Sequence, residues 1–223
     1  MSQLKLTADS GGGTVAIKGP ASTTGNNPFE LTVPGTASGN ILTSTSGSSI
    51  QVLEQFYSVC DGSVIATSAG NLTLPSVTAL QNLTTTFQTI TGSEISYTPP
   101  SGTTQVIYTL QFAMATYDSY GMLHGAFYVD GTEATDAQFT QRNTVNYADG
   151  LYTFKWGINI GGSTTAASGR LASWTSAKTL LMKASEYTGS YEVDIHVVRN
   201  YAGSTPSQVR KPCIGITAIG VPS

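Results

Sequence analysis

Charged side chains are scarce in this sequence of 223 residues: Asp, Glu, Lys and Arg make up 10% of it, against about 25% in an average soluble domain. Hydroxyl groups must cover much of the surface instead, because the chain has 25 Ser and 33 Thr residues. The net charge is −3, and the ten Lys and Arg residues are scattered. This distribution lacks the clustered basic face that nucleic acids require, so we expect no nucleic-acid partner.

Long apolar runs are also missing. No window approaches the ~18 consecutive apolar residues of a membrane-spanning helix. Lys5 near the N-terminus is not followed by the apolar stretch of a secretory signal. We therefore expect no membrane insertion, and a chain that is made and assembled inside a cell.

Cysteine and histidine, which supply many metal ligands and nucleophiles, occur only twice each. Without a signal for an oxidising compartment, Cys60 and Cys213 are expected to be two buried free thiols rather than a disulfide. His124 and His196 both fall in strand-like segments, and the alternation around His196 places it in a regular strand.

No motif of catalysis or metal binding surrounds these residues. A zinc site needs three or four ligands, a nucleophilic triad needs an acid and a base in contact, and a calcium loop needs several carboxylates close together. We expect no catalytic residue, no cofactor, no metal site and no enzymatic activity. A carbohydrate-processing enzyme stays as a distant alternative, which would require paired carboxylates about 5–10 Å apart.

The residues that are abundant favour β-structure. Val106, Tyr108, Leu110, Phe112 and Met114 are apolar and alternate with smaller or polar residues, the period of a half-buried strand. Strand-like segments recur from residue 50 to residue 223 at the spacing of a sandwich. The sequence therefore predicts an all-β protein whose residues 50–223 form a jelly-roll β-sandwich.

Two local features refine the predicted strands. Asp61-Gly62 and Asp130-Gly131 each lie between strand-like segments and predict two β-hairpins. Between Leu72 and Ile90, apolar residues at spacings of 3, 4 and 3 are compatible with a short coiled coil. The β-branched threonines there disfavour a helix, so we predict strands.

The first 43 residues contain only short strand-like segments, each with about three apolar side chains. Such segments bury too little surface to offset the loss of chain entropy, roughly 1–2 kcal/mol per residue, unless they pack against other copies. We therefore divide the chain into an N-terminal β stem for attachment and trimerisation (1–43), a Ser- and Gly-rich linker (44–49) and the sandwich (50–223).

Both parts resemble fibre-type or spike-type structural proteins of tailed, notably marine, bacteriophages. In the stem the resemblance is carried by Leu4-Lys-Leu-Thr, Gly12-Gly-Thr-Val-Ala-Ile-Lys-Gly-Pro, Phe29-Glu-Leu-Thr-Val-Pro and Gly39-Asn-Ile-Leu. In the sandwich it is carried by Gly92-Ser-Glu-Ile-Ser-Tyr-Thr-Pro-Pro-Ser-Gly, Val106-Ile-Tyr, Asp130-Gly-Thr-Glu, Lys178 with its strand, Ser190-Tyr-Glu-Val and Lys211-Pro-Cys-Ile-Gly-Ile-Thr-Ala-Ile.

The resemblance implies a homotrimer with an intertwined stem and a jelly-roll head of the tumour-necrosis-factor and C1q type. It also implies a location in the virion after assembly in the host cytoplasm, and contacts with other virion proteins of the tail or capsid. The expected function is a tail fibre or head fibre whose head binds a host-surface glycan or protein. A capsid decoration protein that stabilises the phage head is the alternative.

Loops at one end of the sandwich supply the candidate binding residues, in which tyrosine rings stand beside short polar side chains. Rigid tyrosine rings give contact area at little entropic cost, which suits sugar or protein recognition. Ordinary tyrosines at the edge of the core are the other interpretation. The candidates are Tyr117, Asp118, Tyr120, Tyr187 and Tyr191.

Overall fold

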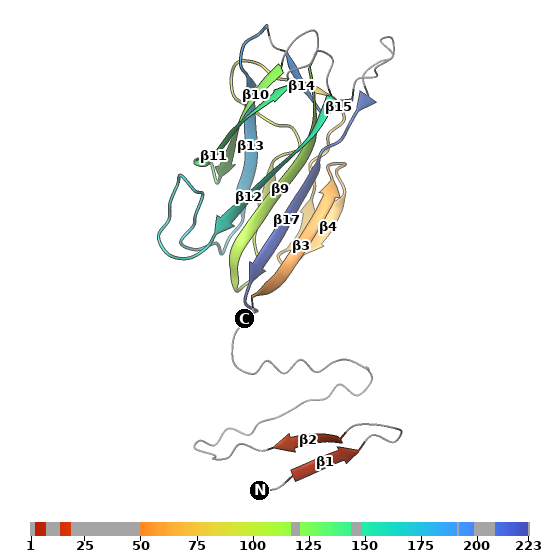
Figure 1. The fold of residues 1–223 in the computed structure, drawn as a ribbon, viewed down its shortest axis with the longest axis vertical. Coiled ribbons are helices and arrows are strands. Elements are labelled where there is room, and N and C mark those ends of the chain that lie inside the picture. Colours follow the sequence, from red (N-terminus) through yellow and green to blue (C-terminus); the bar gives the residue numbers. More distant parts are fainter. Residues whose placement is uncertain are drawn as a thin grey trace. The chain divides into compact units, whose positions relative to one another are not determined.

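The computed structural model describes residues 50–116, 121–143, 149–190, 192–198 and 208–222, and the backbone of residues 3–7 and 14–18. The chain divides into two compact units, residues 1–43 and residues 44–223, and the second unit is called the head below (Figure 1). The predicted linker at 44–49 and the predicted strands near 28–34 and 40–43 lie outside the described residues.

In the first unit, β1 (Gln3–Thr7) and β2 (Thr14–Lys18) form a two-stranded antiparallel ladder. Its register runs from Gln3 opposite Lys18 to Thr7 opposite Thr14, so the two short strands predicted here are confirmed. An isolated two-stranded ribbon is at best marginally stable in water.

The head contains a six-stranded sheet in which β9 is the central strand. On one side β9 pairs with β12, and on the other it pairs with β17 along most of its length and with β14 near its end. The outer pairings are β17 with β3 and β14 with β6. The strands are β3 (Gln51–Val59), β6 (Gln81–Asn82), β9 (Thr103–Thr116), β12 (Asp149–Asn159), β14 (Val193–Ile195) and β17 (Cys213–Gly220).

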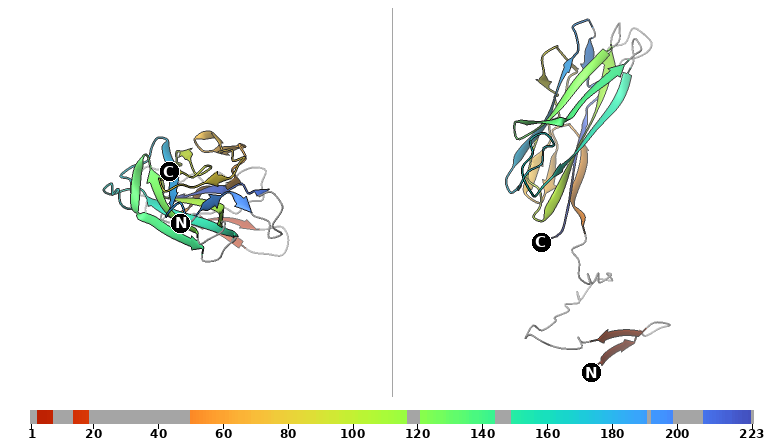
Figure 2. Two further views of the ribbon diagram at one scale, coloured as in Figure 1. Left: turned by 90° about the horizontal axis from the view of Figure 1, so that it is seen from above. Right: turned by 60° about the vertical axis from the view of Figure 1, so that its left-hand side comes forward.

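A five-stranded antiparallel sheet forms the second layer, in the order β11-β10-β13 with β7 and β8 both paired to β13. Figure 2 shows the head from two further sides. The strands are β7 (Gln88–Thr89), β8 (Ile95–Tyr97), β10 (Gly121–Val129), β11 (Thr132–Asn143) and β13 (Lys178–Glu186). Two small ladders stand apart from both sheets, namely β4 (Val64–Thr67) with β5 (Gly70–Thr73), and β15 (Val197–Val198) with β16 (Gln208–Val209).

The connectivity of the eight main strands is that of a jelly roll. One sheet has the order β3-β17-β9-β12 and the other β8-β13-β10-β11, so the chain changes sheet at each step except at the β10–β11 hairpin. The predicted all-β sandwich is confirmed for the head.

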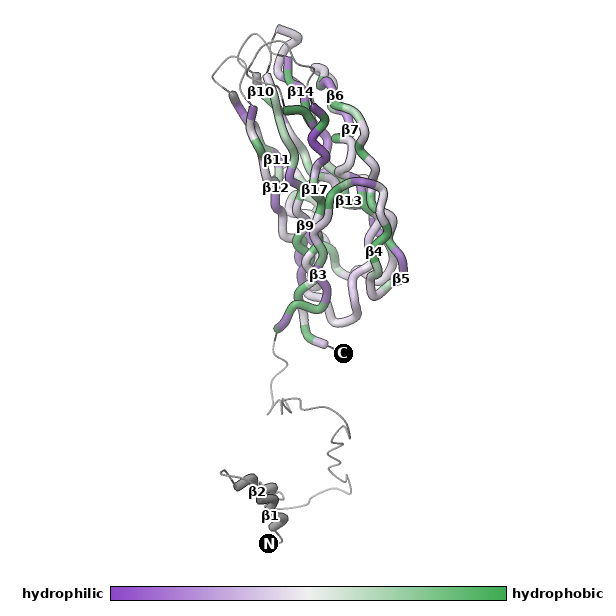
Figure 3. Tube along the Cα trace, turned by 90° about the vertical axis from the view of Figure 1, so that its right-hand side faces the viewer, coloured by the Kyte–Doolittle hydropathy of each residue, from purple (hydrophilic) through white to green (hydrophobic). Residues whose placement is uncertain are grey.

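The core lies between the two sheets and is built on β9. Its alternate residues from Val106 to Met114 are buried, as the pattern predicted, and the alternation of polar and apolar positions is visible along the strands in Figure 3. Tyr108 contacts Phe127 of the other sheet with ring centroids 4.9 Å apart, and its hydroxyl donates to the Ser93 carbonyl at 2.6 Å. The buried phenol thus has the partner that its burial requires.

Of the two predicted hairpins, only the second forms. Asp130 (φ 52°) and Gly131 (φ 79°) make the tight turn between β10 and β11, and both central residues have the positive φ of a type I′ turn. The Asp61-Gly62 prediction was wrong, because β3 pairs with β17, whose nearest paired residue, Cys213, is 154 positions from Val59, and β4 pairs with β5. The Asp61 carboxylate accepts from the Ser63 amide at 2.9 Å, which turns the chain without pairing the flanking strands.

Other predictions are resolved in the same region. The segment from Leu72 to Ile90 is not a helix but contains short strands, as expected, with Leu83 and Ile90 buried in the core. Cys60 and Cys213 are both free, Cys60 buried and Cys213 partly exposed, whereas both were expected to be buried. In the described part of the chain, no helix is long and apolar enough to cross a membrane.

Candidate binding end and outer sheet faces

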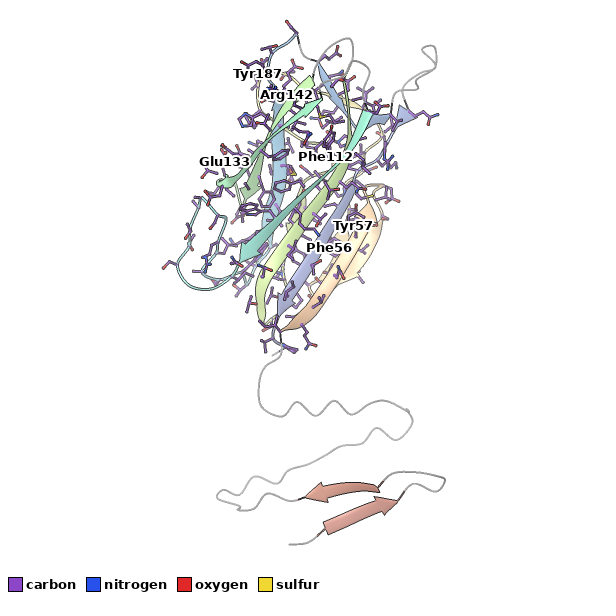
Figure 4. All side chains as sticks on the ribbon, in the orientation of Figure 1. Phe56, Tyr57, Phe112, Glu133, Arg142 and Tyr187 are labelled. Carbon is purple, nitrogen blue, oxygen red and sulfur yellow. The ribbon has the colours of Figure 1, made fainter. Side chains whose placement is uncertain are left out.

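Tyr187 lies at the end of the head opposite to the point where the N-terminal unit is connected. The connection enters at Ile50, beside the end of β17, where Gly220 pairs with Gln51. Tyr187 follows β13 at the other end, with its amide donating to the Met122 carbonyl at 3.1 Å, and its side chain is 63% exposed (Figure 4).

The other four candidate residues, Tyr117, Asp118, Tyr120 and Tyr191, lie outside the described residues. Their described neighbours are at the Tyr187 end, where Thr116 at the end of β9 pairs with Val193 in β14. The structure therefore exposes one predicted binding residue at this end and leaves the cluster as a whole a prediction.

Beneath Tyr187 the end of the sandwich is unusually polar. Glu186 points between the sheets opposite Leu123, and one of its carboxylate oxygens is buried without a hydrogen-bond partner, as is the Thr188 hydroxyl. Burial raises the pKa of Glu186, and the nearby acids Glu192 and Asp194 raise it further. Asp194 is buried and accepts from the Asn82 side chain. A half-satisfied polar layer of this kind is costly in a core.

His196 departs from the regular strand position predicted for it, so that prediction was wrong. It lies between β14 and β15 at φ 63° and is fully buried. Its amide donates to the Ala113 carbonyl and its carbonyl accepts from the Arg210 amide. Neither ring nitrogen has a well-formed hydrogen bond to a described residue, and burial lowers the pKa to about 4, with the Thr91 backbone opposing only part of the shift.

The outer face of the β3-β17-β9-β12 layer, here called the neutral face, carries two charged residues of opposite sign on β12, Asp149 at the start of the strand and Lys155 near its middle. Its amides and hydroxyls bond to one another across strands, at 2.9–3.1 Å, in the pairs Gln55–Thr217, Gln105–Asn159 and Gln111–Thr153. By strand register the face consists of Val52, Gln55, Tyr57, Val59, Gln105, Ile107, Thr109, Gln111, Ala113, Ala115, Asp149, Leu151, Thr153, Lys155, Gly157, Asn159, Cys213, Gly215, Thr217 and Ile219.

Two hollows of about 280 Å³ each meet at Thr153 and Lys155. One lies on the neutral face, where Gly215 leaves the sheet bare and the Tyr57 ring leans over it. The other opens between β11 and β12 and is lined by aromatic rings, among them the stacked pair Phe139 and Phe154 with centroids 5.4 Å apart. The sandwich is therefore open to solvent between residues 139–141 of β11 and residues 152–155 of β12, whereas Asp136 of β11 and Asn159 of β12 bond to the backbone of Ala167 and Leu171.

The outer face of the five-stranded sheet, here called the charged face, is different. Glu133 bonds to the Tyr128 hydroxyl at 3.2 Å, and the Lys183 ammonium lies 4.7 Å from the centre of the same ring. By strand register the face consists of Met122, His124, Ala126, Tyr128, Glu133, Thr140, Arg142, Thr179, Leu181, Lys183 and Ser185.

Among the described residues, no group of three or more His, Cys, Asp or Glu side chains is arranged to hold a metal ion. The polar groups at the Tyr187 end and on the neutral face offer hydrogen bonds and ring surfaces for contact. The arrangement suits binding and assembly.

No model of a protein family matches this chain, and no curated protein matches it. Matches among solved structures include the Gx strain of infectious bursal disease virus (14% identity, 68% of this chain and 38% of that chain, TM-score 0.24). They also include the Gt strain (12%, 79% and 48%, 0.25) and the T13 particle of the same virus (12%, 71% and 41%, 0.24).

This chain therefore spans less than half the length of the matched virus proteins. TM-scores this low carry no argument about function. The resemblance to phage fibres stays a prediction from sequence.

Proposed function

We propose that this chain is a non-enzymatic structural protein of a phage virion, a homotrimeric fibre or spike whose head binds the host surface. The observation that supports the proposal is the two-part organisation. A short β ladder precedes a jelly-roll head, in the order that the sequence resemblance implies. A lone ladder of two five-residue strands has little stability of its own, so other copies would complete it.

The binding task is assigned to the Tyr187 end of the head. This end is opposite to Ile50, where the described head begins, so a stem that attaches to the virion would leave it free to meet the host. Tyr187 exposes a ring there with the amphipathic character of a recognition residue.

Two measurements test the proposal. Sedimentation of the full chain should give three times the 23.2 kDa mass of one copy, and a stable monomer at micromolar concentration would contradict it. Antibody-gold labelling of virions should place the protein on tail or head fibres. Labelling spread evenly over the capsid shell would instead identify a decoration protein.

A further inference from the structure

We propose that the hollow between β11 and β12, here called the edge hollow, binds one sugar ring that carries a carboxylate group. The inference rests on the proposed binding to the host surface and names the class of glycan that the head would take. Three features of the described residues carry it: the aromatic walls of the hollow, the polar side chains at its rim, and its place beside the Tyr187 end.

Aromatic rings form the walls of the edge hollow. Phe139 of β11 stacks on Phe154 of β12 with centroids 5.4 Å apart, and Tyr152 lies beside Phe112 with centroids 6.3 Å apart. Phe112 is buried, whereas the other three rings are partly exposed. The hollow measures about 280 Å³, close to the lower limit of about 300 Å³ for ligand pockets, so it has room for a single ring. One face of a sugar ring consists of C–H groups, which suit the negative face of an aromatic ring.

Polar side chains stand at the rim beside these rings. Gln141 follows Phe139, which packs on the core, by two residues, so its amide also points between the sheets. Gln141 and Lys155 both line the hollow, and no described residue bonds to the Gln141 amide or forms an ion pair with the Lys155 ammonium. An amide donates and accepts as sugar hydroxyls do, and an ammonium forms its strongest hydrogen bonds with an anion.

This combination disfavours a purely apolar occupant. An apolar side chain would fit against the rings, but it would remove water from Gln141 and Lys155 without replacing the lost hydrogen bonds. A neutral sugar would satisfy the amide and leave the ammonium without a counter-charge. The only acid on β12, Asp149, already has an interaction partner and lies six residues from Lys155, about 20 Å along an extended strand. An occupant with C–H groups, hydroxyls and an acid meets all three requirements.

The edge hollow adjoins the proposed binding end. Gln141, Leu123 and Glu186 lie in one row across β11, β10 and β13, and Tyr187 follows Glu186. Arg142, the next residue of β11, pairs with Met122, whose carbonyl accepts from the Tyr187 amide (Figure 4). A glycan chain with one acidic ring in the hollow would therefore continue past a second cation towards the Tyr187 ring.

Binding of three immobilised polymers to the full chain tests the inference. Polygalacturonate offers the sugar ring with its carboxylate, dextran offers the ring without a carboxylate, and polyglutamate offers the carboxylate without a sugar ring. Biosensor measurements at about 0.15 M salt limit binding by exposed charges alone. The wild-type chain should bind polygalacturonate about tenfold more tightly than either of the other polymers.

Variants at the rim locate the binding site. Lys155→Gln removes the ammonium, and Gln141→Glu places a carboxylate beside that of the sugar, so each should lower the affinity for polygalacturonate about tenfold. Lys183→Gln is the matched control, because it removes a cation from the charged face and should leave the affinity unchanged. Circular dichroism checks that each variant folds.

The outcomes separate the inference from the proposed function. Equal binding of dextran would show that the acid is not recognised, and equal binding of polyglutamate would show that an acidic peptide suffices. Either result overturns the inference, as does an equal loss of affinity in Lys183→Gln and Lys155→Gln. If the chain sediments as a trimer and attaches to host cells but binds none of the polymers, the inference fails and the proposed function stands. A monomer that binds polygalacturonate through Lys155 supports the site and contradicts the proposed homotrimer.

Discussion

The outer faces of the two sheets share one architecture and differ in chemistry. The neutral face has two charged residues of opposite sign, Asp149 and Lys155, and bonds its amides and hydroxyls to one another. The charged face has Glu133, Arg142 and Lys183, and Glu133 and Lys183 both contact the Tyr128 side chain. In Figure 4, Tyr57 and Phe56 lie on the layer of the neutral face, whereas Glu133 and Arg142 lie on the other layer.

The difference is one of charge density. A chain with 10% charged residues has few charges to distribute, and the larger neutral face carries two of them whereas the smaller charged face carries three. Charges are depleted at the core of interfaces, and aromatic residues are enriched there. We therefore expect the neutral face rather than the charged face to be in contact within the proposed homotrimer, and the variants below test this expectation.

The largest effect is expected from placing a charge at the centre of each face. Thr217→Arg would bury an unpaired guanidinium in the contact, at a cost of several kcal/mol per interface, so the trimer should dissociate at concentrations over 100-fold higher than for wild type. Thr179→Arg should leave association unchanged. Sedimentation across a concentration series measures both, and circular dichroism checks that each variant folds. Equal behaviour of the two variants would remove the distinction between the faces.

The two histidines extend the comparison to acid stability. His196, buried in the layer of the neutral face, has a pKa of about 4 against an ordinary 6.5, whereas His124 is exposed on the charged face. Between these pH values the unfolded chain binds a proton that the folded chain excludes. The stability that the folded chain gains by keeping His196 neutral is therefore fully present above about pH 6.5. It is lost as pH falls towards 4, and the loss amounts to about 3 kcal/mol.

Asn tolerates the positive φ at position 196 better than most residues, so His196→Asn is the test variant. Urea unfolding between pH 7 and pH 4 should show a shallower loss of stability for His196→Asn than for wild type. His124→Asn should retain the wild-type slope. An unchanged slope in His196→Asn would show that its burial does not govern acid sensitivity.

A smaller effect is expected from truncating one exposed tyrosine on each candidate surface. Tyr57→Ala removes a ring from the neutral face and should weaken association by about 1–2 kcal/mol, five- to thirty-fold. Tyr187→Ala should leave association unchanged and lower binding of the chain to host cells by about tenfold. Sedimentation and a cell-binding assay on both variants measure the two properties. If Tyr57→Ala alone reduced cell binding in an intact trimer, the assignment of the two surfaces would be reversed.

The sequence predicted the fold where local signals and long-range pairing agree. The alternation from Val106 to Met114 was read correctly because a strand between two sheets must alternate, and Asp130-Gly131 was read correctly because its turn joins strands that pair with each other. Asp61-Gly62 is the same dipeptide, but the hairpin predicted for it does not form, because β3 pairs with the C-terminal strand β17. Turn residues report local chain reversal and carry no information about a partner 154 residues away.

The candidate site was predicted less well than the fold. Tyr187 was identified from composition, but the neutral face was missed, because it is assembled from four strands that are distant in sequence. Its signal was present as the absence of Glu and Arg, and the single Asp, at alternate positions of those strands, which becomes visible only once the strand order is known. His196 was placed in a regular strand because the pattern does not encode positive φ.

The smallest effect concerns the two thiols, which report on the neutral face without altering it. Cys213 lies on that face and is partly exposed, whereas Cys60 is buried and has a pKa raised to about 12, mainly by burial. Assembly should shield Cys213, so a maleimide reagent should label wild type slowly and Thr217→Arg about tenfold faster, the ratio that corresponds to 1.4 kcal/mol of protection. Cys60 should stay unlabelled in both, because a buried thiol with a raised pKa forms little thiolate. Mass spectrometry of the labelled peptides distinguishes the two positions, and rapid labelling of Cys213 in a wild-type trimer would show that the neutral face remains open to solvent.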